Sequence, residues 1–234
     1  MNLSYYEVYI TSLRAFTGMG FPFGADEDAA YMVSWLELNK LDGIKSLAKT
    51  YKNFDNQYNA KINLEEINNT YFDLRNISLL MKGPGLFDYY ETQLQNNKNI
   101  NISLINCIDP HYLLPLMFKA SKKINYCKAV LNNENNENII YQARKNLIQI
   151  GTTFDIKMIK DNQIELFFSN ENIKINNFKK LKNEITPKTI QNSLASALSP
   201  DFEDWEQISN LANRTFVPES KESRSKGAGG GDAN

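Results

Sequence analysis

The chain has 234 residues, of which 42% are hydrophobic and 12% aromatic, so it can bury a sizeable core as one domain or two small ones. Its 26 Lys and Arg residues nearly balance its 27 Asp and Glu residues, and the formal charge of -1 supplies no bulk field that would hold the protein on nucleic acid or on an anionic membrane. The N-terminus has no basic segment followed by an apolar core, and no window approaches the roughly 18 apolar residues of a membrane span. We therefore expect a cytoplasmic protein.

The cysteines and the one histidine indicate no metal site. Cys107 and Cys127 lie in apolar, strand-like runs far from any Cys-x-x-Cys spacing, which favours buried free thiols. His111 is the only histidine, so a zinc site would have to gather carboxylates or both cysteines from distant parts of the chain. We interpret His111 and its neighbour Asp109 as a helix cap or a satisfied core pair at a strand-to-helix turn.

The first elements are predicted to be helices. Ser4 and Glu7 have the spacing of a capping box, which predicts a helix to Thr17. A loop with three glycines follows and is expected to carry two rings inward, those of Phe21 and Phe23. We expect Asp26 to cap the next helix.

The second helix is predicted to organise the fold. Its apolar residues recur at helical spacing, and Glu27 and Asp28 place negative charge at the positive end of the helix dipole. We expect this acidic start to meet a cation or a backbone amide, with Arg14 as the leading partner of Glu27. Asp42-Gly43 is typical of a helix end, and a short third helix should follow.

The middle of the chain alternates between turn and strand patterns. Lys82 to Gly85 is a turn by composition, and Ile100 to Cys107 alternates as a strand. An apolar helix is then expected over 112–120, followed by four short strands: Ile124 to Leu131, Ile139 to Arg144, Phe154 to Lys160 and Gln163 to Phe168. Thr186-Pro187 and Ser199-Pro200-Asp201 each start a further helix.

These elements predict an α+β fold, in which N-terminal helices pack on a central antiparallel sheet and C-terminal helices and a Gly-rich tail follow. We predict one α+β domain over residues 1–213. Residues 214–234 form a tail rich in Arg, Ser and Gly.

Both ends of the chain resemble an uncharacterised proteobacterial family known only as a domain of unknown function. The N-terminal residues that carry the resemblance are Arg14, Gly18, Gly20, Gly24, Glu27, Ala29, Trp35-Leu36, Leu41 and Gly43. The C-terminal ones are Arg214-Thr215-Phe216-Val217-Pro218, Ser220, Ser223-Arg224 and Gly227-Ala228-Gly229. The resemblance implies no activity.

A second resemblance concerns Leu41 to Leu47, which is similar to the start of the malate and lactate dehydrogenase family that is unrelated to the Rossmann enzymes. In that family a Ser-His-Gly follows, and its histidine is thought to serve in catalysis. This chain has Ser46-Leu47-Ala48 in its place. If the ancestry holds, the chemistry has been lost at Leu47.

The tail and the glycine loop together suggest a site for a small anionic metabolite. The proposed ligand-binding residues are Arg14, Arg214, Ser220, Ser223, Arg224, Gly227 and Gly229. Arginines hold carboxylates and phosphates, and the backbone amides of a glycine run can line an anion. Glu27 is the candidate general base, although the sequence leaves open whether the chain is an enzyme, and it names no cofactor.

Two other functions remain open. The chain could be a non-catalytic protein partner or a homo-oligomer that assembles through its tail, because it lacks a complete catalytic constellation. It could also be a degenerate relative of the non-Rossmann malate and lactate dehydrogenases.

Overall fold

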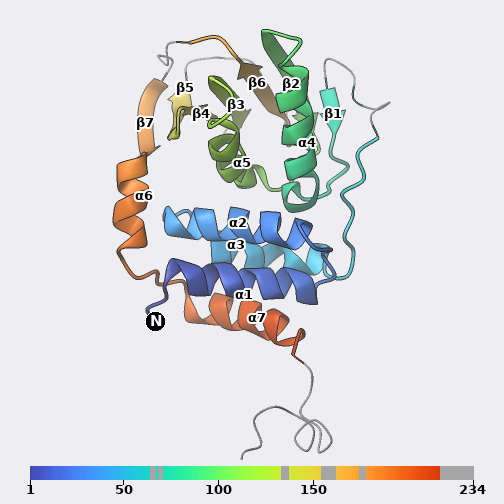
Figure 1. Ribbon diagram of the computed structural model, residues 1–234, viewed down its shortest axis with the longest axis vertical. Coiled ribbons are helices and arrows are strands. Elements are labelled where there is room, and N and C mark those ends of the chain that lie inside the picture. Colours follow the sequence, from blue (N-terminus) through green and yellow to red (C-terminus); the bar gives the residue numbers. More distant parts are fainter. Residues whose placement is uncertain (64–66, 68–70, 133–136, 154–161, 174–177, 217–234) are drawn as a thin grey trace, which may run out of the picture.

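The computed structural model describes residues 1–63, 67, 71–132, 137–153, 162–173 and 178–216. Figure 1 shows a layer of helices below a sheet, with further helices in front of the sheet and at its side. The helical layer consists of α1 (Tyr5–Gly18), α2 (Ala25–Leu38), α3 (Gly43–Thr50) and α7 (Phe202–Asn213). The other three are α4 (Leu79–Gln93), α5 (Leu113–Ala120) and α6 (Pro187–Leu194).

The sheet has seven strands in the order β1-β2-β6-β3-β4-β5-β7. Their bounds are β1 (Tyr71–Asp73), β2 (Asn99–Ile105), β3 (Tyr126–Asn132), β4 (Asn138–Arg144), β5 (Leu147–Thr153), β6 (Ile164–Ser169) and β7 (Phe178–Ile185). All neighbouring pairs are antiparallel except β1 and β2, which run parallel. The predicted α+β fold is confirmed, with one parallel pair at the edge of the sheet.

Helix α2 lies at the centre of the packing. It contacts α1 and α3 on one side and α4 and α5 on the other, and nine of its 14 residues are buried. Its cap differs from the prediction: Gly24 is the N-cap, and Asp26 lies in the first turn. The helix starts earlier because the carbonyl of Pro22 already accepts hydrogen bonds from the N–H groups of Ala25 and Asp26.

The turn between α2 and α3 differs from the predicted helix end at Asp42-Gly43. α2 ends at Leu38, and left-handed backbone occurs at Lys40 (φ 59°) and Asp42 (φ 51°). Gly43 is then the first residue of α3. A Cβ atom at Gly43 would collide with the carbonyl oxygen of Val33, so glycine is needed for the close approach of the two helices.

The predicted turn over Lys82 to Gly85 is wrong, because these residues lie inside α4. Two tertiary contacts favour the helix. Asp109 accepts a hydrogen bond from the N–H of Leu79 at the start of α4, 3.0 Å away. Gly83 packs against the side chain of Leu116 on α5, where a Cβ would be only 2.6 Å from Leu116 Cδ1. Packing and capping therefore override the low helix propensity of Gly-Pro-Gly.

The strand predictions are partly confirmed. β2, β3, β4 and β6 coincide with predicted runs, and Ile164, Leu166 and Phe168 are buried on one face of β6 as expected. The strand predicted over 154–160 lies outside the described residues. β5 and β7 were not predicted, because β5 contains Gly151 and β7 is largely polar.

Buried side chains of the helical layer, of α4 and α5 and of the sheet form one continuous core. Cys107 and Cys127 are buried free thiols, as predicted. Among the described helices, none is both long enough and apolar enough to cross a membrane.

Candidate functional site

The glycine loop between α1 and α2 holds one ring inside and one outside. Gly20 (φ 85°) and Gly24 (φ 87°) both have a positive φ, a backbone conformation that favours glycine because it has no Cβ atom. Phe21 is buried against Phe16, with 4.9 Å between ring centroids. The side chain of Phe23 is 95% exposed, so the prediction of two inward rings is wrong for Phe23.

The structure brings Arg14 and Arg214 to the same corner of the helical layer, although 200 residues separate them. The guanidinium carbon of Arg14 lies 5.2 Å from the ring centroid of Phe216, and a Cβ at Gly18 would be 3.3 Å from the Cβ of Arg214. Arg214 donates a hydrogen bond of 2.7 Å to Asp55. We call Arg14, Arg214 and Phe216 the arginine corner.

Charge is unevenly compensated in the arginine corner. The ion pair with Asp55 raises the pKa of Arg214 and neutralises its charge. Arg14 is exposed and has no carboxylate partner among the described ion pairs. Its cation is therefore available to a ligand. The other predicted ligand-binding residues lie outside the described residues: Ser220, Ser223, Arg224, Gly227 and Gly229.

The acidic start of α2 meets a cation, a hydroxyl and a backbone amide. Asp28 forms an ion pair of 2.9 Å with Lys119, and Asp26 accepts hydrogen bonds from the hydroxyl of Thr17 and from the N–H of Glu27. The expectation for this acidic start is confirmed. The cation is Lys119 and not the expected Arg14, and no ion pair between Arg14 and Glu27 is found among the described residues. The side chain of Glu27 is exposed, and its role as a general base stays a prediction.

Position 47 cannot take part in proton transfer. Leu47 lies on α3 and is completely buried in the core, next to Ile44 on the same helix face. It has no titratable group and no contact with solvent. The position at which the resemblance would place a histidine is therefore occupied by a packing residue.

Asp109, which is buried, and His111, which is partly buried, lie in the turn between β2 and α5. Asp109 accepts hydrogen bonds from the hydroxyl of Ser78, the N-cap of α4, and from the N–H of Leu79. It is therefore a satisfied core group that stabilises the start of α4, and its side chain does not cap the helix that follows it. Burial nevertheless raises the pKa of Asp109 to about 6. Burial also lowers the pKa of His111 to about 4, and its Nε2 atom has no hydrogen-bond partner among the described residues.

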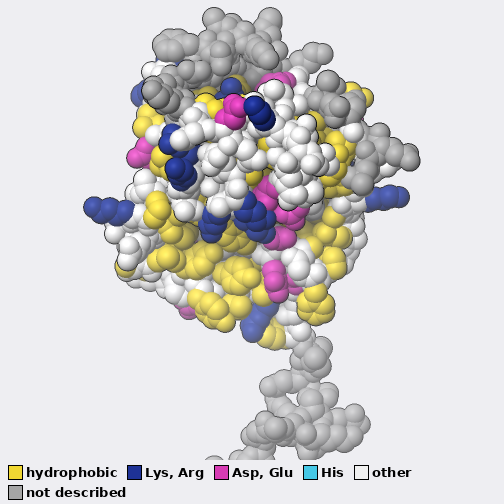
Figure 2. Space-filling model, turned by 45° about the horizontal axis from the view of Figure 1, so that its top comes forward, with side chains coloured by type: hydrophobic (Ala, Val, Ile, Leu, Met, Phe, Trp, Pro, Cys, Tyr) yellow, Lys and Arg dark blue, Asp and Glu magenta, His cyan; other side chains and the backbone are white. Residues whose placement is uncertain are grey.

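A cavity of about 480 Å³ lies between α1, α2, α5 and α6 and was not predicted from the sequence. Four rings line it, those of Tyr5, Tyr31, Trp35 and Phe118, and we call it the aromatic pocket. The rings of Trp35 and Phe118 are 5.4 Å apart. Figure 2 shows hydrophobic side chains gathered over the lower half of one face of the molecule, below a group of charged ones. The residues of the pocket are too far apart in sequence to form a recognisable motif.

Polar groups of the aromatic pocket are few. The indole N–H of Trp35 and the amide oxygen of Asn146 are both buried, and neither has a hydrogen-bond partner within the described part of the chain. Lys122 lies at the same pocket, with its Nζ atom 5.3 Å from the ring centroid of Phe118.

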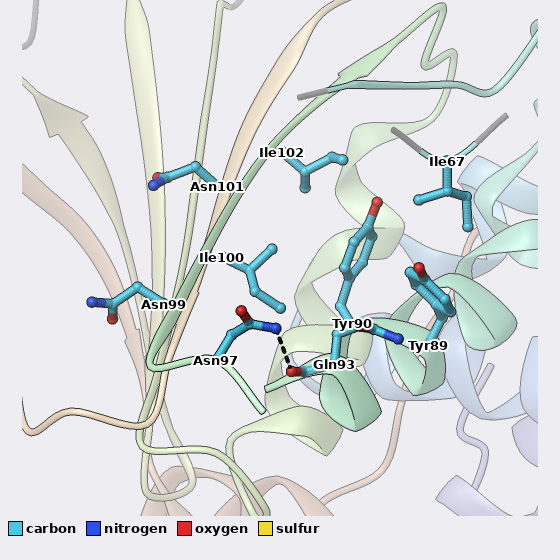
Figure 3. A pocket seen from close by; sticks show the side chains of 9 residues that line it. All are labelled: Ile67, Tyr89, Tyr90, Gln93, Asn97, Asn99, Ile100, Asn101 and Ile102. Atoms are coloured by element: carbon cyan, nitrogen blue, oxygen red, sulfur yellow. Dashed lines mark hydrogen bonds between the residues drawn. The ribbon is translucent and has the colours of Figure 1, made fainter. Parts of the chain in front are cut away.

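A second cavity, of about 270 Å³, lies between α4 and β2 (Figure 3). Tyr90 is buried there and stacks on Phe168 of β6, with 5.6 Å between ring centroids. Figure 3 shows its hydroxyl reaching towards Ile102 and Ile67, while side-chain amides line the lower part. Among the described residues, no three His, Cys, Asp or Glu side chains gather as metal ligands would.

Several solved structures with a similar fold are named as dehydrogenases or putative dehydrogenases. A malate dehydrogenase from Pyrococcus horikoshii OT3 aligns with a TM-score of 0.62 and 8% identity, covering 94% of this chain and 97% of that chain. A sulfolactate dehydrogenase from Methanocaldococcus jannaschii aligns with a TM-score of 0.61 and 10% identity, covering 91% of this chain and 97% of that chain. A putative malate/lactate dehydrogenase from E. coli aligns with a TM-score of 0.59 and 9% identity, covering 97% of this chain and 98% of that chain. At these identities the likeness shows a shared fold.

Residues 3–75 match the model of a family described as "Protein of unknown function (DUF3726)". The resemblance to a domain of unknown function is thus confirmed, over the part that contains α1, α2, α3 and the glycine loop. The pattern from Arg214 to Gly229 lies outside the matched residues. No curated protein matches the sequence.

Proposed function

We propose that this protein binds a small anionic metabolite at the arginine corner. The observation that carries the proposal is the meeting of Arg14, Arg214 and Phe216, which the fold brings together from opposite ends of the chain. Arg14 supplies an exposed cation that has no ion-pair partner within the described part of the chain, and Phe216 supplies an apolar wall beside it. A guanidinium group binds a carboxylate through two parallel hydrogen bonds, which adds orientation to charge.

The fold supports the same ligand class. The neighbours in structure are named as dehydrogenases of malate, lactate and sulfolactate, and these compounds are small hydroxy acids with an anionic group. Leu47 stands where the resemblance places a catalytic histidine, and it is buried in the core. We therefore propose that the chain binds an anion of this class without the dehydrogenase reaction.

Replacing Arg14 by glutamine should weaken anion binding roughly tenfold, because a charge-assisted hydrogen bond contributes about 1.5 to 3 kcal/mol. Isothermal titration calorimetry with malate, lactate and sulfolactate at low salt measures this change. Lys45→Gln is the matched control, since Lys45 is an exposed helical cation in the first turn of α3. The control should bind like the unmodified protein.

Two results contradict this proposal. One is equal affinity of Arg14→Gln and Lys45→Gln for every anion that binds. The other is oxidation of malate or lactate with NAD or NADP, which would show that the reaction proceeds without a histidine at position 47.

Assembly through the C-terminal tail is a second candidate function. The rings of Phe23 and Phe216 are 95% and 55% exposed, and Figure 1 shows the α1–α2 loop and the end of α7 at the same end of the helical layer. Exposed aromatic rings near one another are typical of protein contact sites. This candidate function places a protein partner or a second copy of the chain there.

Removing residues 214–234 tests the second candidate function. If the tail mediates self-association, light scattering coupled to size exclusion will give a larger mass for the full chain than for the shortened one. Phe23→Ser should reduce the mass of the full chain in the same way, because it removes an exposed ring. Equal masses for all three proteins at the same concentration would count against self-association.

A further inference from the structure

Two residues that line the aromatic pocket have a buried polar atom without a hydrogen-bond partner among the described residues. Trp35 is only 3% exposed, and its indole N–H has no acceptor in that part of the chain; the amide oxygen of Asn146 has no donor there. Buried polar groups in native proteins are almost always hydrogen-bonded, because desolvation without a partner costs free energy. Both atoms belong to residues that line the aromatic pocket, so a ligand that displaces the side chains covering them would offer each of them a partner.

The walls of the cavity define the body of that partner. Four aromatic rings line it, and a volume of about 480 Å³ lies within the range of small-molecule sites. Aromatic rings prefer to stack or to meet edge-to-face with other rings. A planar aromatic molecule therefore fits these walls better than a compact hydroxy acid.

One wall is formed by a helix that is weakly held. α6 contributes no buried residue, and its Pro187, Ile190 and Leu194 line the aromatic pocket. Leu194 is 51% exposed although it faces this apolar cavity. A bound ring would cover Ile190 and Leu194 and complete the packing of α6 against α2.

Charge at the cavity selects an anion. Lys122 lies beside the ring of Phe118, and the described residues give it no carboxylate partner. Its neighbour Lys123, by contrast, is paired with Glu91 at 2.7 Å and does not line the pocket.

We propose that the aromatic pocket is a binding site for a small planar aromatic anion. Its ring lies among Tyr5, Tyr31, Trp35 and Phe118, and its anionic group pairs with Lys122. A hydroxyl or similar group on the ring accepts from Trp35 and donates to Asn146. This site shares no residue with the arginine corner, so an experiment that contradicts one of the two proposed sites leaves the other untouched.

The indole N–H of Trp35 provides a direct readout. The chain has two tryptophans, and Trp205 does not line the aromatic pocket, so Trp205→Phe assigns the two indole signals in a proton–nitrogen correlation spectrum. 4-Hydroxybenzoate is the probe, and 4-hydroxybenzamide is its neutral counterpart. We expect the Trp35 signal to move downfield in a saturable way with both probes, and the Trp205 signal to stay in place.

Lys122→Met tests the charge and Lys123→Met is its matched control. Lys122→Met should weaken 4-hydroxybenzoate roughly fivefold, the effect of an exposed ion pair of about 1 kcal/mol, and leave 4-hydroxybenzamide unchanged. Lys123→Met should alter neither affinity. Both lysines are exposed, so melting temperatures close to that of the unmodified protein will confirm that the variants fold.

Three outcomes overturn the proposal. The first is a Trp35 signal that does not move at saturating concentrations of either probe. The second is an equal loss of 4-hydroxybenzoate affinity in Lys122→Met and Lys123→Met. The third is a Trp35 signal that depends on protein concentration and not on the probe, which would assign the aromatic pocket to contact between copies of the chain.

Discussion

Gly43→Ala is expected to lower the free energy of unfolding by about 3 kcal/mol, at the upper end of the range for overpacked sites. A Cβ at this position would collide with the carbonyl oxygen of Val33 and would lie 2.8 Å from the backbone nitrogen of Glu37 and 3.0 Å from Leu36 Cβ. Backbone atoms of α2 cannot move aside as a side-chain end can. The methyl group would therefore push α3 away from α2, at the centre of the core. Urea denaturation followed by circular dichroism and by Trp fluorescence measures the loss.

Gly85→Ala is the matched control for Gly43→Ala. Gly85 also lies in a helix, but a Cβ there would meet only the Cδ1 atom of Ile62, at 3.2 Å, and this side-chain end can move. We expect a change within about 1 kcal/mol, because alanine also lowers the entropy of the unfolded chain. Similar losses for both variants would show that the contact between α2 and α3 is looser than the structure indicates.

Asp109 and His111 are expected to make opposite contributions to stability as the pH falls. The pKa of His111 is about 4 in the fold and 6.5 as its ordinary value, so the unfolded chain takes up the proton first. Stability from His111 is therefore lost below about pH 6.5, by about 2 kcal/mol on going from about pH 7 to about pH 5. Asp109 has a pKa of about 6 against an ordinary 3.8, so the folded chain takes up that proton first. Its contribution rises by about 1 kcal/mol over the same interval.

Two single variants separate these contributions. Asparagine does not titrate, so His111→Asn and Asp109→Asn each remove one of the two titrating groups. At each pH, the unfolding free energy of the variant is subtracted from that of the unmodified protein. This difference should fall on acidification for His111→Asn and should rise for Asp109→Asn. The two effects nearly cancel in the unmodified protein. Differences that stay constant between about pH 7 and about pH 5 would contradict the burial of both groups.

Leu47 is a packing residue at the position where the resemblance to the malate and lactate dehydrogenase family would place a histidine. In this chain the helix that the resemblance associates with catalysis serves the core, with Ile44, Leu47 and Ala48 buried. A histidine at position 47 would be buried without solvent and would lose a packing side chain. Exposed and polar features instead lie at two other places, the arginine corner and the aromatic pocket.

Local signals in the sequence predicted where several helices begin. The capping box of Ser4 and Glu7 and the cap at Thr186 before Pro187 are both present in the structure, and the last helix begins directly after Ser199-Pro200-Asp201, with Asp201 as its N-cap. Each depends on hydrogen bonds between residues two or three positions apart. The alternation of Ile164, Leu166 and Phe168 predicted β6 for a similar reason, since the side chains of a strand alternate between the two faces of its sheet.

The tertiary structure alone decided features that depend on contacts between distant residues. Lys82 to Gly85 became helical because Asp109 caps α4 and Leu116 covers Gly83, and neither contact has a local signal. Asp28 found Lys119 as its partner, 91 residues away, where the sequence had pointed to Arg14 for the same acidic turn.

The same division applies to the candidate sites. The sequence by itself determined the α+β class, the free thiols and the likeness of Gly18 to Gly43 to a family of unknown function, because composition, periodicity and motif spacing are properties of short segments. Arg14 and Arg214 were both named from the sequence, but only the packing of α7 against α1 placed them together. The aromatic pocket draws on residues from Tyr5 to Leu194 and exists only where four helices meet. Its chemistry depends on which side chains the fold leaves without partners, and no local pattern records that.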